Sequence, residues 1–137
     1  MTYFVDANIF LRYMTNDIPE QAEAVAALFR KAADGELRLI TNTMVMAELV
    51  WVMESAYQLP RKTIQEYMEI ILNTPGLNIP EAEMISQALV WYVEKNVDFI
   101  DAYNAAWMEE MDVTRIFTFD QNHFRRFSQL RALLPPG

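Results

Sequence analysis

Four acidic residues stand in short apolar segments that are far apart along the chain: Asp6, Glu48, Asp101 and Asp120. Asp6 is the clearest of them, because it follows a β-prone run at 3–5 and comes two residues before Asn8, where a strand should turn into a helix. Carboxylate and amide oxygens are the ligands that suit Mg²⁺ or Mn²⁺. The four acids therefore predict a divalent metal site.

The elements that must position these acids alternate between strands and helices. Strands are expected at 3–5, 37–41, 77–79 and 115–119. Helices are expected at 8–14, 19–33, 43–57, 61–73, 81–95 and 101–111, with a short helix or turn at 121–127. This alternation predicts a parallel sheet covered by helices on both faces. In such sheets ligands bind outside the carboxyl ends of the strands, which is where Asp6 and Asp120 are expected.

Each acid also has an ordinary structural interpretation. Asp6 and Asp101 can act as helix N-caps, and Asp120 can be a turn residue. Glu48 can be solvated or paired with a basic side chain, although burying it in its apolar helix would be costly without a basic group or a cation. The joint pattern, four acids directed to one edge of a sheet, favours the metal site.

The composition is that of a folded protein, and we expect one domain over residues 1–137. Hydrophobic residues make up 53% of the chain and charged residues 22%, which argues against disorder. There is no cysteine, so a disulfide framework, a thiolate metal site and a cysteine nucleophile are excluded, and a reducing compartment is favoured. No secretory signal or membrane-length apolar run is visible, so we expect a cytoplasmic protein with no membrane association.

The net charge of −8 argues against a nucleic-acid binder held by diffuse positive charge. Divalent ions bound by the acids would nevertheless place positive charge where a phosphate must lie, so the charge does not exclude an RNA substrate. The three glycines, Gly35, Gly76 and Gly137, form no phosphate-cradling loop, which disfavours a nucleotide-binding protein.

Four segments carry a resemblance to a known family: residues 5–11, 47–49, 98–106 and 118–124. In order and spacing the chain resembles the PIN-domain nucleases, and among them the toxin ribonucleases of VapBC-type toxin–antitoxin modules, over nearly its whole length. The resemblance implies a three-layer α/β/α sandwich with a central, mainly parallel sheet and a Mg²⁺- or Mn²⁺-dependent ribonuclease site. It matches Asp6, Glu48 and Asp101 to the family's central metal-binding acids, and Asp120 to a fourth, more variable acid.

The resemblance also implies supporting roles around the acids for four polar residues: Asn8, Thr43, Asp98 and Thr118. Arg12, Arg125 and Arg126 are candidate contacts to the RNA backbone, or else ordinary exposed residues. His123, the only histidine, is a candidate base or substrate contact, but a lone histidine on a loop is more often solvated.

The resulting hypothesis is in-line hydrolysis of an RNA phosphodiester bond. Asp6 and Asp101 would be the principal metal ligands, Glu48 would complete the ligand shell, and Asp120 would hold a second ion or the attacking water.

The family resemblance also implies partners, namely a second copy of the chain in a homodimer and a cognate antitoxin. Part of the antitoxin would bind an apolar groove among the helices expected at 19–33, 43–57 and 61–73. The alternatives are a housekeeping PIN nuclease in RNA processing or decay, and a non-enzymatic metal-binding interaction module.

Overall fold

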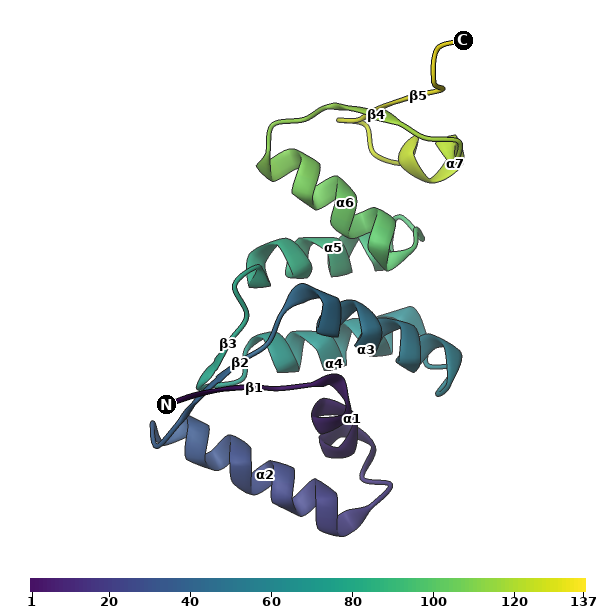
Figure 1. Cartoon of the computed structure of the whole chain (residues 1–137). Coiled ribbons are helices and arrows are strands. Elements are labelled where there is room, and N and C mark those ends of the chain that lie inside the picture. Colours follow the sequence, from purple (N-terminus) through teal and green to yellow (C-terminus); the bar gives the residue numbers. More distant parts are fainter. The chain divides into compact units, whose positions relative to one another are not determined.

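The computed structural model describes residues 1–137 as two compact units, Met1–Ala82 and Glu83–Gly137 (Figure 1). The first unit contains β1 (Thr2–Phe4), α1 (Ala7–Thr15), α2 (Pro19–Ala33), β2 (Arg38–Ile40), α3 (Thr43–Ser55), α4 (Arg61–Leu72) and β3 (Leu77–Asn78). The second contains α5 (Ala82–Glu94, starting at the boundary), α6 (Phe99–Glu110), β4 (Arg115–Phe117), α7 (Gln121–Phe124) and β5 (Arg131–Leu133). None of these helices combines the length and the apolar character that crossing a membrane requires.

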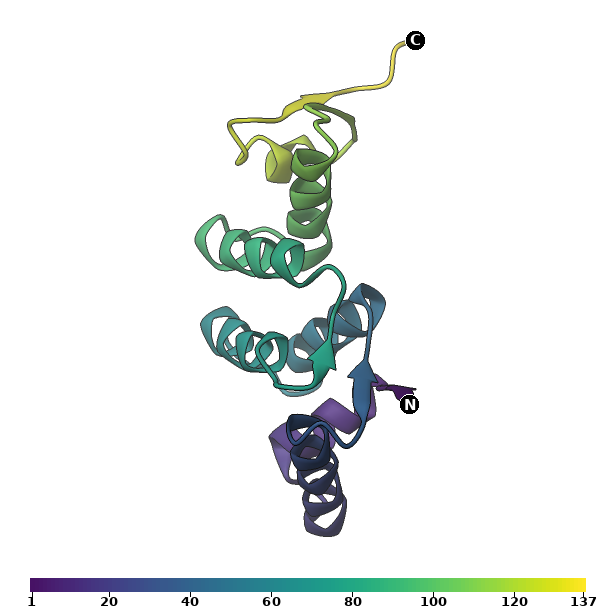
Figure 2. The same ribbon diagram turned by 90° about the vertical axis from the view of Figure 1, so that its left-hand side faces the viewer.

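The first unit is built on a three-stranded parallel sheet with the strand order β1-β2-β3. Phe4 lies opposite Ile40, and Ile40 lies opposite Asn78 on the other side. Just beyond this register the buried Thr41 hydroxyl donates to the Val5 carbonyl at 2.8 Å, which ties the ends of β1 and β2 together. The α2 helix lies on one side of the sheet, and α3 and α4 lie on the other (Figure 1, Figure 2).

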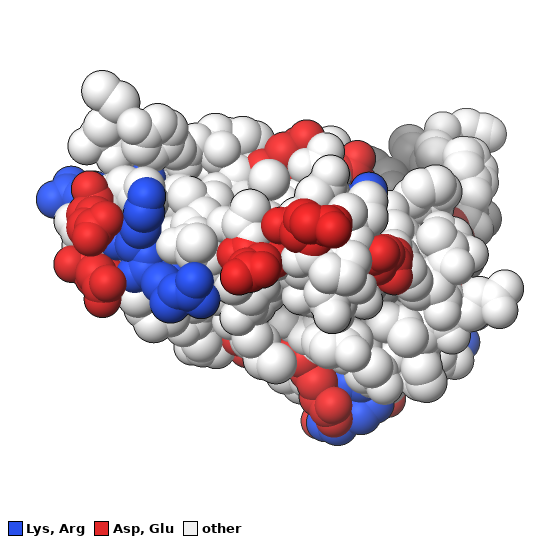
Figure 3. Space-filling model, turned by 90° about the horizontal axis from the view of Figure 1, so that it is seen from below, with Lys and Arg blue, Asp and Glu red and all other residues white.

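The α2 helix illustrates how the sequence specifies its elements. Pro19 occupies the first turn, Glu20 lies near the positive end of the helix dipole, and Arg30 and Lys31 lie near the negative end. Its buried residues recur at helical spacing: Ala22, Val25, Phe29 and Ala32. On the outer face of α2, basic side chains gather at one end and acidic ones lie across the middle (Figure 3). The predicted helix at 19–33 is confirmed at both ends.

The second unit pairs β4 with β5 in parallel, with Arg115 opposite Arg131 and Phe117 opposite Leu133. The strand β5 was not predicted from the sequence. Its three residues are exposed or half-buried, so no alternation of buried and exposed side chains marks the strand. Backbone pairing with β4, rather than side-chain burial, defines this strand.

Two predicted boundaries near the acids are wrong. The strand expected at 115–119 ends at Phe117, so Asp120 lies three residues beyond it rather than one. The apolar Phe119 suggested a longer strand, but its side chain is 84% exposed. The helix expected at 101–111 begins at Phe99, which places Asp101 inside its first turn. The helices predicted between residues 8 and 95 agree with the structure to within two residues at either end.

Gly76, just before β3, has a φ of +81°, and a Cβ at this position would collide with the backbone carbonyl of Ala32 in α2. Gly35 has the same φ, but open space surrounds it. We expect G76A to lower the free energy of unfolding by about 2–4 kcal/mol and G35A by about 1 kcal/mol, since only the first adds a clash to the unfavourable φ. Urea unfolding followed by circular dichroism measures both, and equal losses would contradict the close packing of Gly76 against α2.

Candidate active site

Asp6 stands at the carboxyl end of β1 and is the N-cap of α1. Its Oδ1 accepts a hydrogen bond from the Ala7 amide at 2.7 Å, so the capping role considered from the sequence is real. The carboxylate is exposed, and its second oxygen is available to a cation or to water. Asn8 is exposed in the first turn of α1, and the Arg12 side chain donates to Gln21 Oε1 at 2.8 Å, which links α1 to α2.

Thr43 lies at the same edge of this sheet, after β2. Its hydroxyl donates a hydrogen bond to Glu81 Oε1, and Glu81 follows β3 as Asp6 follows β1. Glu81 was not among the site residues predicted from the sequence. The signal that could have found it is its position, since an acid three residues beyond a parallel strand falls at the edge where the other strands also end.

Glu48 lies in the second turn of α3, directly before the buried residues Leu49 and Val50. Its own side chain is exposed, so no desolvation penalty requires a partner for it. Glu48 and Asp6 belong to the first unit, whereas Asp101 and Asp120 belong to the second, and the convergence of all four acids stays a prediction.

In the second unit, three of the singled-out residues form a compact cluster. Asp98 is exposed at the N-cap position of α6, Asp101 is half-buried in the first turn of the same helix, and His123 is half-buried on α7. One ligand atom from each lies within 4.8 Å of those of the other two. This separation is short enough for one cation to contact all three residues.

Asp120 joins the cluster through His123. The Nδ1 atom of His123 lies 3.0 Å from Asp101 Oδ2 and 3.3 Å from Asp120 Oδ2. The Asp120 amide donates to Thr118 Oγ1 at 2.9 Å, so Thr118 supports the backbone from which Asp120 projects. The simple solvated interpretation of His123 is therefore wrong. A sequence signal existed, because His123 is three residues after Asp120 and one helical turn brings such residues together.

The donor groups of this cluster fit a divalent cation. Carboxylate oxygens are hard ligands that suit Mg²⁺ and Mn²⁺, and an imidazole nitrogen is compatible with Mn²⁺ and later transition metals. Asp98 and Asp120 both occupy N-cap positions, yet neither side chain makes a capping hydrogen bond. Capping therefore does not account for either of these carboxylates.

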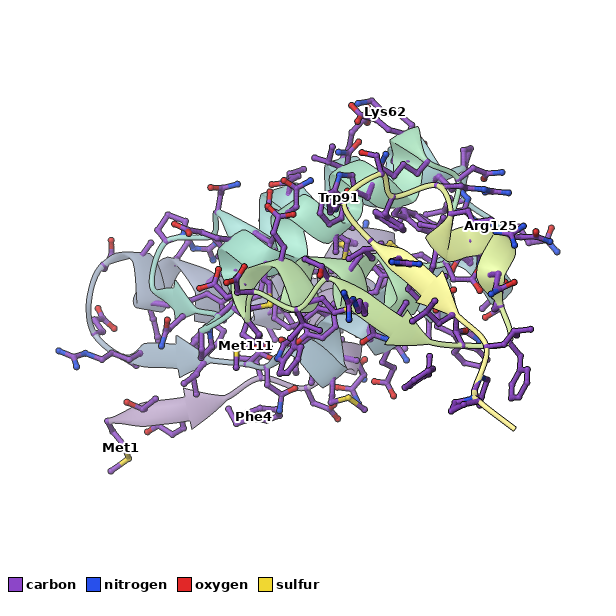
Figure 4. All side chains as sticks on the ribbon, turned by 90° about the horizontal axis from the view of Figure 1, so that it is seen from above. Met1, Phe4, Lys62, Trp91, Met111 and Arg125 are labelled. Atoms are coloured by element: carbon purple, nitrogen blue, oxygen red, sulfur yellow. The ribbon has the colours of Figure 1, made fainter.

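The two adjacent arginines that follow α7 differ in their surroundings. Arg126 donates through Nη1 to the carbonyl oxygens of Lys95, at 3.0 Å, and Asn96, and Lys95 Nζ donates to the Arg126 carbonyl at 2.9 Å. Arg125, the C-cap residue of α7, donates to Gln121 Oε1 in the first turn of that helix, and its side chain points away from the ribbon (Figure 4). Arg126 therefore links α7 to the end of α5, whereas Arg125 is presented to the outside.

Comparison with known proteins gives the family. The PIN domain matches residues 3–130, a range that includes every acid described above. The chain belongs to the PIN-domain family. Among proteins of known function, this PIN domain is similar to the VapC ribonuclease of Aquifex aeolicus (strain VF5). The two are 25% identical over 126 residues, which cover 92% of this chain and 90% of the relative.

The family match confirms the predicted resemblance and the predicted fold class, a three-layer α/β/α sandwich with a mainly parallel sheet. Every strand pair in the structure is parallel. The PIN family and the VapC relative also support the predicted nuclease class.

The two arginines supply a matched test of how α7 is held. We expect R126A to lower the free energy of unfolding by about 1–2 kcal/mol, because two carbonyls of the α5–α6 connection lose a charged donor. R125A should change it by less than about 0.5 kcal/mol, as expected for an exposed side chain with a local partner. Thermal unfolding of the two variants makes the comparison, and an unchanged R126A would show that this link does not anchor α7.

Proposed function

We propose that this PIN domain is a Mg²⁺- or Mn²⁺-dependent ribonuclease and the toxin of a type II toxin–antitoxin module. It acts on RNA in the cytoplasm as a single domain over residues 1–137. The observation that carries the proposal is the cluster in the second unit, where Asp101 and Asp120 approach one imidazole from two different elements. Family membership and the VapC ribonuclease relative support RNA as the substrate.

The residues that would hold the cation are Asp6, Glu48, Asp101 and Asp120. Each supplies carboxylate oxygens, and three of the four project from the residues between a strand and a helix or from the first turn of a helix, where the backbone is fixed. When bound, a divalent cation would supply positive charge for the scissile phosphate and acidify a bound water. The four acidic side chains hold these oxygens in place before RNA binds.

The supporting residues act through these acids. Asn8 is two residues after Asp6 in the first turn of α1, Asp98 is three residues before Asp101 at the N-cap of α6, and Thr118 accepts a hydrogen bond from the Asp120 amide. Thr43 acts through Glu81, whose carboxylate it binds. Arg12 and Arg125 would contact the RNA backbone. Arg126 would contact it through the guanidinium nitrogens that do not donate to the Lys95 and Asn96 carbonyls.

An apolar pocket in the first unit supports the antitoxin as partner. It has a volume of about 150 Å³ and lies among α1, α2 and α4, with these residues in its lining: Phe10, Tyr13, Phe29, Tyr67, Ile70 and Ile71. A second pocket adjoins it, since Met14 and Tyr67 line both, and it extends toward Met53 and Tyr57 at the end of α3. An apolar pocket with a second pocket beside it suits the apolar face of an antitoxin helix. The homodimer is part of the same proposal and rests on the family resemblance alone.

Substitution of the proposed ligands tests the nuclease. We expect D6N and D101N each to reduce cleavage of total RNA by at least about 100-fold, because a neutral amide binds a divalent cation far more weakly than a carboxylate does. E110Q, on the exposed end of α6, is the matched control and should leave the rate unchanged. Gel analysis of RNA incubated with Mg²⁺ or Mn²⁺ measures all three, and near-wild-type cleavage by D6N or D101N would remove that residue from the site.

Partner binding at the apolar pocket is tested separately from RNA cleavage. Ile70 is 62% exposed at the pocket, so I70E should retain RNA cleavage but lose co-purification with the product of a small gene adjacent to the gene for this chain. E23Q, on the outer face of α2, should keep both properties. Binding of that product by I70E with wild-type affinity would place the partner elsewhere. Absence of any such adjacent gene would favour the housekeeping nuclease.

A further inference from the structure

His123 is not one of the four proposed metal ligands, yet it contacts two of them. Its Nδ1 atom lies between two carboxylates of different elements, 3.0 Å from Asp101 Oδ2 on α6 and 3.3 Å from Asp120 Oδ2 at the start of α7. We propose that His123 is a positioning residue of the nuclease site, whose Nδ1–H holds the Asp101 and Asp120 carboxylates in the arrangement that binds the cation. The inference rests on the proposed function, because it assumes that these acids are ligands.

The direction of the hydrogen bonds follows from the groups involved. Ionised carboxylates only accept hydrogen bonds, so a ring nitrogen that lies within reach of two of them must carry the proton. The Nδ1 atom is therefore the donor in both contacts. The single N–H is shared unequally, with the shorter distance to Asp101. His123 therefore ties Asp120 to the more buried Asp101, whose side chain is 21% exposed against 52% for Asp120.

The imidazole can act as such a tie because α7 is held in place on both sides. Phe124 and Phe127 are 3% and 1% exposed, and the Phe127 ring packs edge-on against Trp91 of α5 at 5.1 Å between ring centroids. The Arg126 amide donates to the His123 carbonyl at 3.2 Å, and the Arg126 side chain is bonded to the end of α5. The backbone of His123 is thereby tied to α5 and the residues that follow it, and the ring reaches Asp101 of α6 from this fixed base.

The consequence is preorganisation of the metal ligands. Asp120 has no capping hydrogen bond from its side chain, so without His123 its carboxylate could rotate into solvent and away from Asp101. Two carboxylates on separate elements also repel each other, and a hydrogen-bond donor between them reduces that repulsion. Outer groups that hydrogen-bond to metal ligands affect metal affinity by about 10–100-fold when removed. We expect an effect of this size at His123.

Three substitutions separate positioning from other roles of the ring. In H123N the side-chain amide can place an N–H where Nδ1–H stands, whereas in H123Q the amide lies nearer the position of Nε2. H123A removes both. Mn²⁺ binding by the purified, metal-free protein, followed by electron paramagnetic resonance of the free ion without RNA, gives a readout that does not depend on cleavage. Near-UV circular dichroism in EDTA checks that each variant is folded.

We expect H123A and H123Q to weaken Mn²⁺ binding by about 10–100-fold and H123N to stay within about threefold of wild type. Cleavage assays should show the same order, with rescue by H123N. Equal Mn²⁺ affinity of wild type and H123A would overturn the proposal. Loss of binding in H123N as large as in H123A would overturn it too, because it would make the ring a direct ligand through Nε2.

The D101N variant distinguishes failure of this inference from failure of the proposed function. If D101N loses Mn²⁺ binding while H123A keeps it, the metal site stands and only the positioning role of His123 is wrong. If D101N binds Mn²⁺ as tightly as wild type, the proposed metal site itself is wrong, and the role of His123 in it is overturned with it.

Discussion

Parallel pairing of very short strands determines where the polar side chains of the candidate site can lie. All paired strands run in the same direction within their sheets, so each strand must leave its sheet at the carboxyl end and enter a helix or a loop there. In the first unit this edge collects Asp6 after β1, Thr43 after β2 and Glu81 after β3. In the second unit Asp120 follows β4 in the same way. The strands themselves are only two or three residues long, so most of their role is to fix these starting points.

The structure also separates carboxylates with a capping role from those without one. Asp6 does cap its helix, through one oxygen, and keeps the other oxygen exposed. Asp101 is not at the N-cap of α6, because the helix begins two residues before it. Asp98 and Asp120 stand at N-cap positions and make no capping bond through their side chains. The capping alternative thus explains part of the role of Asp6 and none of the second-unit cluster, where Asp101 and Asp120 both contact His123.

The sequence predicted most of the fold because most of its elements carry local signals. The α2 helix was predicted at both ends because Pro19 starts it and Asp34 and Gly35 follow it. The strand β5 was missed because its identity depends on pairing with β4, a non-local interaction that a window of sequence does not contain. The end of β4 was misplaced because Phe119 is apolar but exposed.

The candidate site was predictable in its acids and not in the contacts between them. Asp6, Asp101 and Asp120 could be found because each interrupts an apolar segment near an expected strand or helix boundary. Glu81 and His123 were missed or given little weight, since their importance lies in a bond to a residue that is remote in sequence: Thr43 for Glu81, and Asp101 for His123. Side-chain partners of this kind follow from the packing of helices, which sequence periodicity alone does not specify.

With a net charge of −8, the chain has few basic side chains to hold phosphate, so the proposed recognition of RNA would depend on a bound cation. The most direct test of the account is therefore cleavage of total RNA by the purified protein with Mg²⁺ or Mn²⁺, beside the same reaction in EDTA and with D101N from a matched preparation. The account predicts discrete products with either metal and none in the two controls. Cleavage that persists in EDTA, or a folded protein that binds Mn²⁺ and cuts no RNA, would contradict it.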